Sequence, residues 1–230
     1  MKFAYGSSKK GDVSEALRTI TEPAALFFSV AKEDMLERAA SEIEKTFPGV
    51  ASIGGVGQAY IDRQFFDAGI TVIAMKENIK VVADVLEEAS VMPIKYIRRL
   101  ENAVRAVGGE RGNTACFDIC SAGADVRAVT TLSDYLCRLG YDLAGGTSNS
   151  AMVACNGRVY KDACAFFIFR NLRGKIKSYK ENIYVHPEEN AKQFMVTEAD
   201  PKKYKILTLE NTSAEKVYTS DLGIGRDKIK

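Results

Sequence analysis

One feature constrains the fold of this chain more than any other: part of the sequence recurs at an offset of about 90 residues. The apolar run AALFFSV (24–30) matches the run TACFDIC (114–120). Each run is followed by a stretch with the apolar spacing of an amphipathic helix, which ends at Pro48-Gly49 in the first copy and at Gly140 in the second. The recurrence therefore predicts two halves with the same order of elements.

The rest of each copy has the pattern of β-strands. Short strands that end in a glycine pair, ASIGGVG (51–57) and DLAGGTS (142–148), follow the helices. A hairpin and a continuous apolar strand come next, and one further strand completes each copy. We therefore expect a mixed α/β (α+β) fold in which two β-α-β-β-β-β halves, at about 21–92 and 113–187, form one domain.

The glycine pairs, Gly54-Gly55 and Gly145-Gly146, occupy the same place in both halves. They permit two interpretations. Either the backbone there needs a positive φ or a close strand crossing, or the glycines open space for a ligand. The second pair is the better candidate for a ligand because small polar residues follow it. These residues are Thr147, Ser148 and Asn149.

The segment after the second pair does not match a nucleotide-binding loop. The G-x-G-x-x-G fingerprint and the P-loop Lys-Ser/Thr ending are absent, and no helix pattern follows the glycines. Instead, Asn156-Gly157 lies between two β-prone runs and predicts a two-residue hairpin with positive φ at both residues. Asn156, Arg158 and Tyr160 on this hairpin are candidate ligand contacts.

Asp118 interrupts the apolar run ACFDIC, where a carboxylate must be paired or must serve a site. Its counterpart in the first half is Phe28, so the repeated unit does not itself need an acid there. A buried ion pair or an exposed position is one interpretation. The other is a partner for a cationic ligand group such as an ammonium. The full set of candidate ligand-binding residues is Gly54, Gly55, Asp118, Gly145, Gly146, Thr147, Ser148, Asn149, Asn156, Arg158 and Tyr160.

The five cysteines are expected to be free thiols, because their neighbours are apolar and the sequence starts without a signal-peptide core. Cys155, beside the hairpin turn, is the cysteine expected at an exposed position, either as a reactive thiol or as an inward strand residue. Cys116 and Cys120 share a strand face, but His186, the one histidine, is distant in sequence. We therefore expect no metal site, and a structural or solvent role for His186.

The charge balance and the apolar runs exclude two classes of partner. A net charge of +2 gives no electrostatic footprint for nucleic acid, and no apolar run approaches the length of a membrane span. We therefore expect neither nucleic acid nor membrane as a partner, and the expected free thiols indicate a cytoplasmic protein. The oligomeric state stays open. Asp67 and Asp162, which recur at the same point of both halves, are expected to form hydrogen bonds in turns.

The run LAGGTSNSAMVACNGRVYKDACAFFIFRN (143–171), followed by GKIKSYKENIYVHPE (174–188), resembles the N-terminal domain of the FIST family. The resemblance extends over roughly residues 3–187. The stretch FMVTEADPKKYKILTLENTSAEKVYTSDLGIG (194–225) resembles the start of the companion C-terminal FIST domain. The resemblance thus implies a FIST N sensory domain at 1–190 and a truncated start of a FIST C domain at 191–230, in a fragment or a short form.

FIST proteins are bacterial and eukaryotic intracellular signal-transduction proteins. The resemblance therefore implies a sensory module that binds a small ligand, amino acids among the candidates, and controls an output such as a methyl-accepting chemotaxis region. It supplies no catalytic residues, so we expect no enzyme and no cofactor. Two alternatives stay open: a hydrolase or transferase that uses the Gly145-Gly146 pocket, and a protein-interaction scaffold. A cluster of side chains with a perturbed pKa beside these glycines would favour the enzyme. An exposed apolar patch without a pocket would favour the scaffold.

Overall fold

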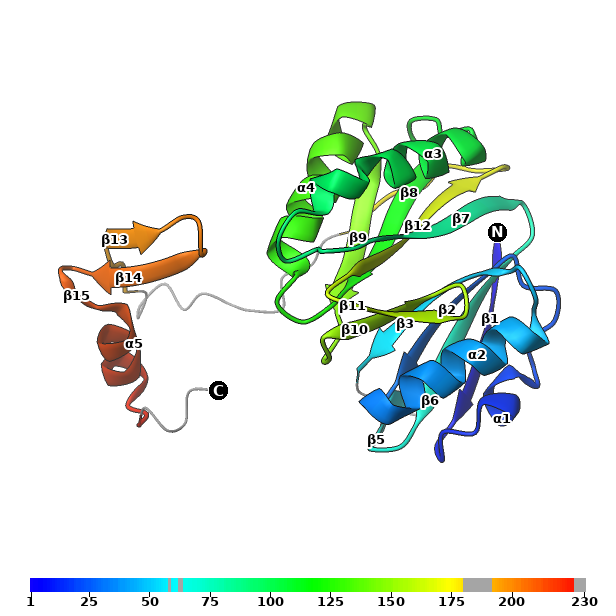
Figure 1. Ribbon diagram of the computed structural model, residues 1–230, viewed down its shortest axis with the longest axis horizontal. Helices are drawn as coiled ribbons and strands as arrows, with labels where there is room; N and C mark the ends of the chain where they lie inside the picture. The colour runs from blue at the N-terminus through cyan, green and yellow to red at the C-terminus, as the bar shows by residue number, and fades with distance from the viewer. Residues whose placement is uncertain (58, 62–63, 180–191, 226–230) are drawn as a thin grey trace. The chain divides into compact units, whose positions relative to one another are not determined.

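The computed structural model describes residues 1–57, 59–61, 64–179 and 192–225. The chain divides into two compact units, Met1–Tyr179 and Lys180–Lys230 (Figure 1). Within the described residues, no helix combines the length and the hydrophobicity that crossing a bilayer requires.

The first sheet of the larger unit has the strand order β1-β6-β2-β3-β10-β11. Its strands are β1 (Lys2–Ser8), β2 (Ala25–Val30), β3 (Ala51–Val56), β6 (Ile70–Lys76), β10 (Met152–Cys155) and β11 (Arg158–Lys161). The helices α1 (Val13–Leu17) and α2 (Leu36–Thr46) pack on one face, and the 3₁₀ turn η1 (Glu33–Met35) precedes α2. The apolar stripe of α2 and the alternate residues of β2 are buried together, which explains the amphipathic spacing of the sequence.

The second sheet has the strand order β7-β12-β8-β9. Its strands are β7 (Ile79–Leu86), β8 (Thr114–Cys120), β9 (Asp142–Thr147) and β12 (Cys164–Asn171). The helices α3 (Ile97–Val107) and α4 (Asp125–Leu139) cover its outer face, and the 3₁₀ turn η2 (Pro93–Tyr96) precedes α3. Both helices end at a glycine in the left-handed conformation, Gly108 and Gly140, as the helix-stop signals predict.

The two sheets pack face to face, with the helices on the outside (Figure 1). A third apolar cluster fills the space between the sheets, and in it the rings of Phe27 and Phe117 meet edge to face at 5.1 Å between centroids. Successive residues of β2 and β8 therefore alternate between the helix layer and this inter-sheet core. Alternation into two apolar layers explains why both strands read as continuous apolar runs.

The strand pairings recur between the sheets, but with other boundaries than the sequence predicts. β1-β6-β2-β3 and β7-β12-β8-β9 both contain two antiparallel pairs followed by a parallel pair. The strand expected to end the first half, β7, pairs instead with β12, because the turn at Glu77-Asn78, with positive φ at both residues, leads the chain into the second sheet. A common fold of the halves 21–92 and 113–187 stays a prediction.

The two hairpins of the repeat also differ. Among the described residues, β4 (Ala59–Ile61) and β5 (Gln64–Phe66) pair with each other and with no other strand, whereas β10 pairs with β3 and extends the first sheet. Asn156 and Gly157 have φ values of 47° and 75°, as the hairpin signal predicts. The final strand expected at 175–185 is not formed by residues 175–179, and its remainder lies outside the described residues.

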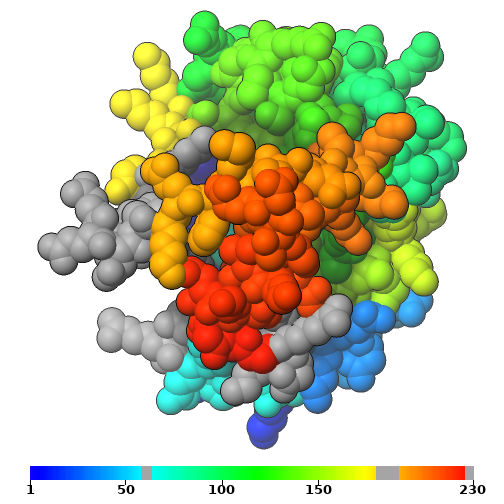
Figure 2. Space-filling view, turned by 90° about the vertical axis from the view of Figure 1, so that its left-hand side faces the viewer, coloured from blue at the N-terminus to red at the C-terminus, as the bar shows by residue number. Residues whose placement is uncertain are grey.

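The described residues of the smaller unit, 192–225, form a three-stranded antiparallel sheet and one helix. Its elements are β13 (Val196–Asp200), β14 (Lys205–Leu209), β15 (Thr212–Ser213) and α5 (Ala214–Leu222). Figure 2 shows the surface of β14 in orange and of α5 in red. No residue of α5 is buried, so this helix contributes no core to its own unit.

Candidate functional site

A surface hollow of about 470 Å³ lies between α4 and the edge strand β9. This volume falls within the usual range of small-molecule sites. The lining residues come from β8, α4 and β9. They are Asp118, Asp125, Val126, Val129, Thr130, Leu143, Ala144, Gly145, Gly146 and Thr147. The hollow thus contains four of the sequence-predicted site residues, namely Asp118, Gly145, Gly146 and Thr147.

The hollow is a consequence of the β8-α4-β9 connection. β8 and β9 are parallel neighbours, and α4 crosses between them on the outer face of the sheet. β9 pairs with no other described strand, so residues 144–147 remain exposed along the sheet edge. Carboxyl ends of parallel strands beside a helix N-terminus are a common place for ligands in sheets of this kind.

Asp118 forms the floor of the hollow, and its side chain is only 2% exposed. It lies opposite Gly145 in the β8–β9 register, and a Cβ atom at Gly145 would overlap both the Oδ1 and the backbone oxygen of Asp118. The second glycine pair is therefore required for close approach at its first position. Gly146 differs, since a Cβ there would meet no atom within 4 Å.

The Asp118 carboxylate has thiols, not cations, as partners. Its Oδ2 accepts hydrogen bonds from the Sγ of Cys120 at 3.3 Å and of Cys164 at 3.8 Å. No Lys or Arg in the described ranges forms an ion pair with it, so the expected buried ion pair is absent there. Burial raises the pKa of Asp118 to about 6, and the two thiol hydrogen bonds oppose that rise.

The first glycine pair lies away from the hollow, and core side chains occupy the space beside both of its glycines. Gly54 is opposite Phe28, whose ring lies 2.5 Å from where a Cβ would be, and a Cβ at Gly55 would overlap the side chain of Ile119. Neither pair contains a glycine with positive φ. Close packing, and not a left-handed backbone, therefore accounts for Gly54, Gly55 and Gly145.

The rim of the hollow is acidic and apolar. Asp125 begins α4, and its Oδ2 accepts a hydrogen bond from the Thr147 hydroxyl at 3.5 Å. Val126 and Val129 are 44% and 38% exposed on the helix face above. Among the residues that the structure describes, the lining includes two carboxylates and no lysine or arginine. The hollow is therefore complementary to a small molecule with a cationic group and an apolar part.

The other predicted residues occupy different surroundings. Ser148 is buried; its Oγ accepts from the Val56 amide and donates to the Met152 carbonyl, both at 3.0 Å, so it links the two sheets. Asn149 follows, and its amide donates to the Val56 carbonyl at 2.7 Å. The side chain of Asn156 binds the Ser52 amide at 3.0 Å. Arg158 and Tyr160 lie on β11 of the first sheet and do not line the hollow.

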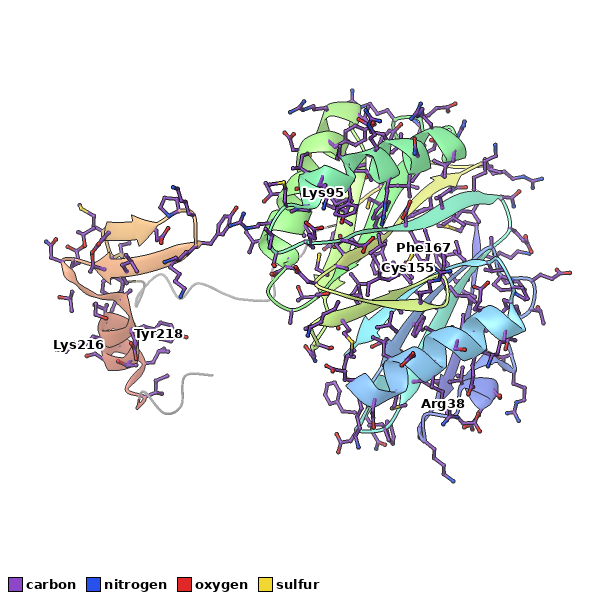
Figure 3. All side chains as sticks on the ribbon, in the orientation of Figure 1. Arg38, Lys95, Cys155, Phe167, Lys216 and Tyr218 are labelled. Atoms are coloured by element: carbon purple, nitrogen blue, oxygen red, sulfur yellow. The ribbon has the colours of Figure 1, made fainter. Side chains whose placement is uncertain are left out.

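The expectation that Cys155 is the exposed cysteine is wrong. Cys155 is 3% exposed and lies beside Phe167 between the sheets (Figure 3), because β10 pairs with β3 and turns this residue inward. Burial raises the pKa of its thiol to about 12, which makes it a poor nucleophile. Cys137 on α4 is the exposed cysteine, and all five cysteines are free thiols, as predicted.

Three further expectations concern turn and loop residues. The Asp162 carboxylate accepts hydrogen bonds from the amide and the hydroxyl of Ser90, both at 2.9 Å, so its structural role is confirmed. The side chain of Asp67 is exposed, and no hydrogen bond is recorded for it in the described part of the chain. His186 lies outside the described residues.

The sequence patterns did not predict that residues of α4 line the hollow. The helical pattern assigns Val129 to the buried stripe of α4, but the buried residues there are Ala128, Leu132 and Leu136. The available signal was the acid at the start of the helix, Asp125, followed at once by a valine. An apolar residue on a helix face beside the buried stripe marks an exposed apolar surface.

Comparisons with known proteins identify the family of this chain. The family model described as the FIST N domain matches residues 24–212. No curated protein matches the sequence. The crystal structure of cyanuric acid hydrolase from A. caulinodans is similar, with a TM-score of 0.39 and 10% identity over 74% of this chain and 71% of that chain. The likeness to this structure is too weak to carry an argument. On the family match, the chain belongs to the FIST family, whose domains are sensory domains of signal-transduction proteins.

Proposed function

We propose that the hollow between α4 and β9 binds a small ligand with a cationic group, amino acids among the candidates, and that binding is passed on to an output domain. The observation that carries the proposal is the pair of carboxylates, Asp118 and Asp125, in a lining whose described residues include no lysine or arginine. A cationic ligand would supply the positively charged partner that no described lysine or arginine provides for the buried Asp118 carboxylate. Membership in a sensory family supports ligand binding over a purely structural role.

The groups of an amino acid have complementary partners in the hollow. An ammonium would bind Asp118 Oδ1, which lies under Gly145, and Asp125 at the rim. An apolar side chain would pack on Val126 and Val129. The N-cap residue of α4, Ala124, makes no side-chain hydrogen bond, so amides of the first turn can donate hydrogen bonds to a ligand carboxylate.

The path onward from the hollow runs through β9. Ser148 and Asn149, directly after this strand, are hydrogen-bonded to Val56 on β3. A ligand that moves β9 against α4 would therefore change the contact between the sheets. We propose that the output domain is a methyl-accepting chemotaxis region of a bacterial, cytoplasmic signalling protein. We also propose that residues 191–230 are the start of a FIST C domain.

An enzyme of the hydrolase or transferase type is the second candidate. A carboxyl group with a pKa of about 6 beside Gly145 is what general acid–base catalysis near neutral pH requires. Against it, the hydroxyl of Ser148, the nearest serine to the glycine pair, is engaged in two buried hydrogen bonds. A bound ligand that is recovered unchanged after incubation supports the sensor, and a converted one supports the enzyme.

A thermal-shift screen of amino acids and other small amines tests the proposal. A ligand at 100 times its Kd should stabilise the folded protein by about 2.7 kcal/mol. Asp118→Asn and Asp125→Asn should each weaken the response, because each removes a carboxylate from the hollow. Asp134→Asn on α4 is the matched control, since this acid is exposed and paired with Arg138 outside the hollow. A hit that both hollow variants bind as well as the control does would contradict the proposal.

A further inference from the structure

A carboxylate and two thiols lie beneath α4 where the first sheet has aliphatic and aromatic side chains. In the first sheet, the positions matched through the glycine pairs and the strand registers are part of an apolar core. They are Phe28, Val30 and Ile70. In the second sheet, the same positions carry a carboxylate and two thiols. They are Asp118, Cys120 and Cys164. The first sheet packs without such groups, so the fold does not explain them.

The three groups converge on one point. Cys120 and Cys164 lie directly opposite each other on neighbouring antiparallel strands, and both are completely buried. Their Sγ atoms and an oxygen of Asp118 all lie within 4.8 Å of one another, with Sγ–Oδ2 distances of 3.3 and 3.8 Å. Tetrahedral zinc, with bonds of about 2.3 Å to sulfur and 2.0–2.2 Å to oxygen, separates its ligands by roughly 3.5–3.8 Å. The side chains are thus already near the required spacing.

We propose that Asp118, Cys120 and Cys164 bind a thiophilic metal cation of the Zn²⁺ class. Thiolates select Zn²⁺ or Cu(I) over Mg²⁺ and Ca²⁺, which prefer all-oxygen sites. Binding of Zn²⁺ would form two Zn–S bonds and one Zn–O bond, and the two thiol protons would leave to the solvent. The metal cation would supply, in place of a ligand ammonium, the positive charge that the buried carboxylate has from no described lysine or arginine.

The site adjoins the hollow through Asp118, while Cys120 and Cys164 are completely buried. Three protein ligands leave a fourth position for a water molecule or for a donor atom of a small molecule. Asp118 lines the hollow, which provides a route for the cation, while its Oδ2 faces the thiols. The proposal does not rest on the proposed ligand, because the metal alone tests it. Sequence spacing could not reveal the set, since Cys164 is 44 residues from Cys120 and joins it only through strand pairing.

Titration of the reduced, metal-free protein with Co²⁺ tests the site under anaerobic conditions. We expect the thiolate-to-cobalt charge-transfer band and the visible bands of a tetrahedral site, saturating at about one equivalent and lost when Zn²⁺ is added. Cys120→Ser and Cys164→Ser should abolish the charge-transfer band. Cys116→Ser is the matched buried control on the same strand face, and Cys137→Ser is the exposed control; both should keep the band.

Far-UV circular dichroism of each variant before metal addition separates loss of the site from loss of the fold. If a serine variant unfolds, the wild-type titration and the two control variants decide the outcome. A wild-type protein without a stoichiometric thiolate band overturns the proposal. So does a folded Cys116→Ser or Cys137→Ser variant that loses the band, because the thiolates would then belong to another cysteine.

Discussion

Replacing Gly145 with alanine should destabilise the protein, whereas the same change at Gly146 should not. A Cβ at Gly145 would overlap the Asp118 carboxylate and the Asp118 backbone oxygen. The carboxylate can rotate only toward its buried neighbours, and the backbone oxygen is fixed by the parallel β8–β9 pairing. Non-bonded atoms prefer separations of 3.5–4.0 Å, so the strands would have to move apart by roughly 1 Å.

The cost of such overpacking is about 1–3 kcal/mol, and the backbone obstruction places Gly145→Ala in the upper part of that range. Gly146 has free space and no positive φ, so Gly146→Ala should be neutral or stabilising by up to about 1 kcal/mol. The two variants, one residue apart, should therefore differ by about 2–4 kcal/mol in the free energy of unfolding.

Urea denaturation followed by far-UV circular dichroism measures this difference, since the chain has no tryptophan to serve as a fluorescent probe. A loss of about 2 kcal/mol lowers the midpoint by roughly 1 M for a typical m-value. Equal midpoints for the two alanine variants would refute the claim that Gly145 is needed to accommodate Asp118.

Two further predictions concern buried hydroxyls and thiols. Ser148→Ala should lower the free energy of unfolding by about 1–3 kcal/mol in urea denaturation, because it leaves the buried Val56 amide without its acceptor. Ser52→Ala is the control and should change stability little, since the buried Ser52 hydroxyl has no partner in the described residues. Equal losses for the two variants would contradict the assigned link between the sheets. Alkylation of the native protein without reductant should label one thiol, that of Cys137, and mass spectrometry of Cys137→Ser should show no label; rapid labelling of Cys155 in the native state would show that its burial is wrong.

Local sequence patterns predict much of the fold where neighbouring residues decide the structure. The strand at 24–30, the helix stop at Gly140 and the Asn156-Gly157 hairpin all depend on short-range periodicity or on φ, and the structure has them. The partner of β7 is decided by long-range pairing. Its apolar alternation fits either sheet, and the Glu77-Asn78 turn that sends it to the second sheet has no distinctive sequence signal.

The candidate site could be predicted only in part for the same reason. Asp118 was identifiable because a carboxylate within an apolar strand needs an explanation, and Gly145 because the pair recurs. The direction of the Ser148 side chain was not predictable, since a serine after a strand can face a pocket or form hydrogen bonds with a neighbouring strand. The thiol partners of Asp118 come from strand register, which becomes known only when the sheet is known.

Calorimetric titration of a ligand from the screen into a variant with a filled hollow tests the central claim most directly. Val129→Trp places a large ring over the hollow from a position that is 38% exposed, so it fills the space without removing core contacts. Val91→Trp, at a 63% exposed position outside the hollow, is the control. We predict that Val129→Trp weakens binding at least about tenfold, or 1.4 kcal/mol, while Val91→Trp leaves Kd unchanged. An equal Kd for both variants would show that the ligand binds elsewhere.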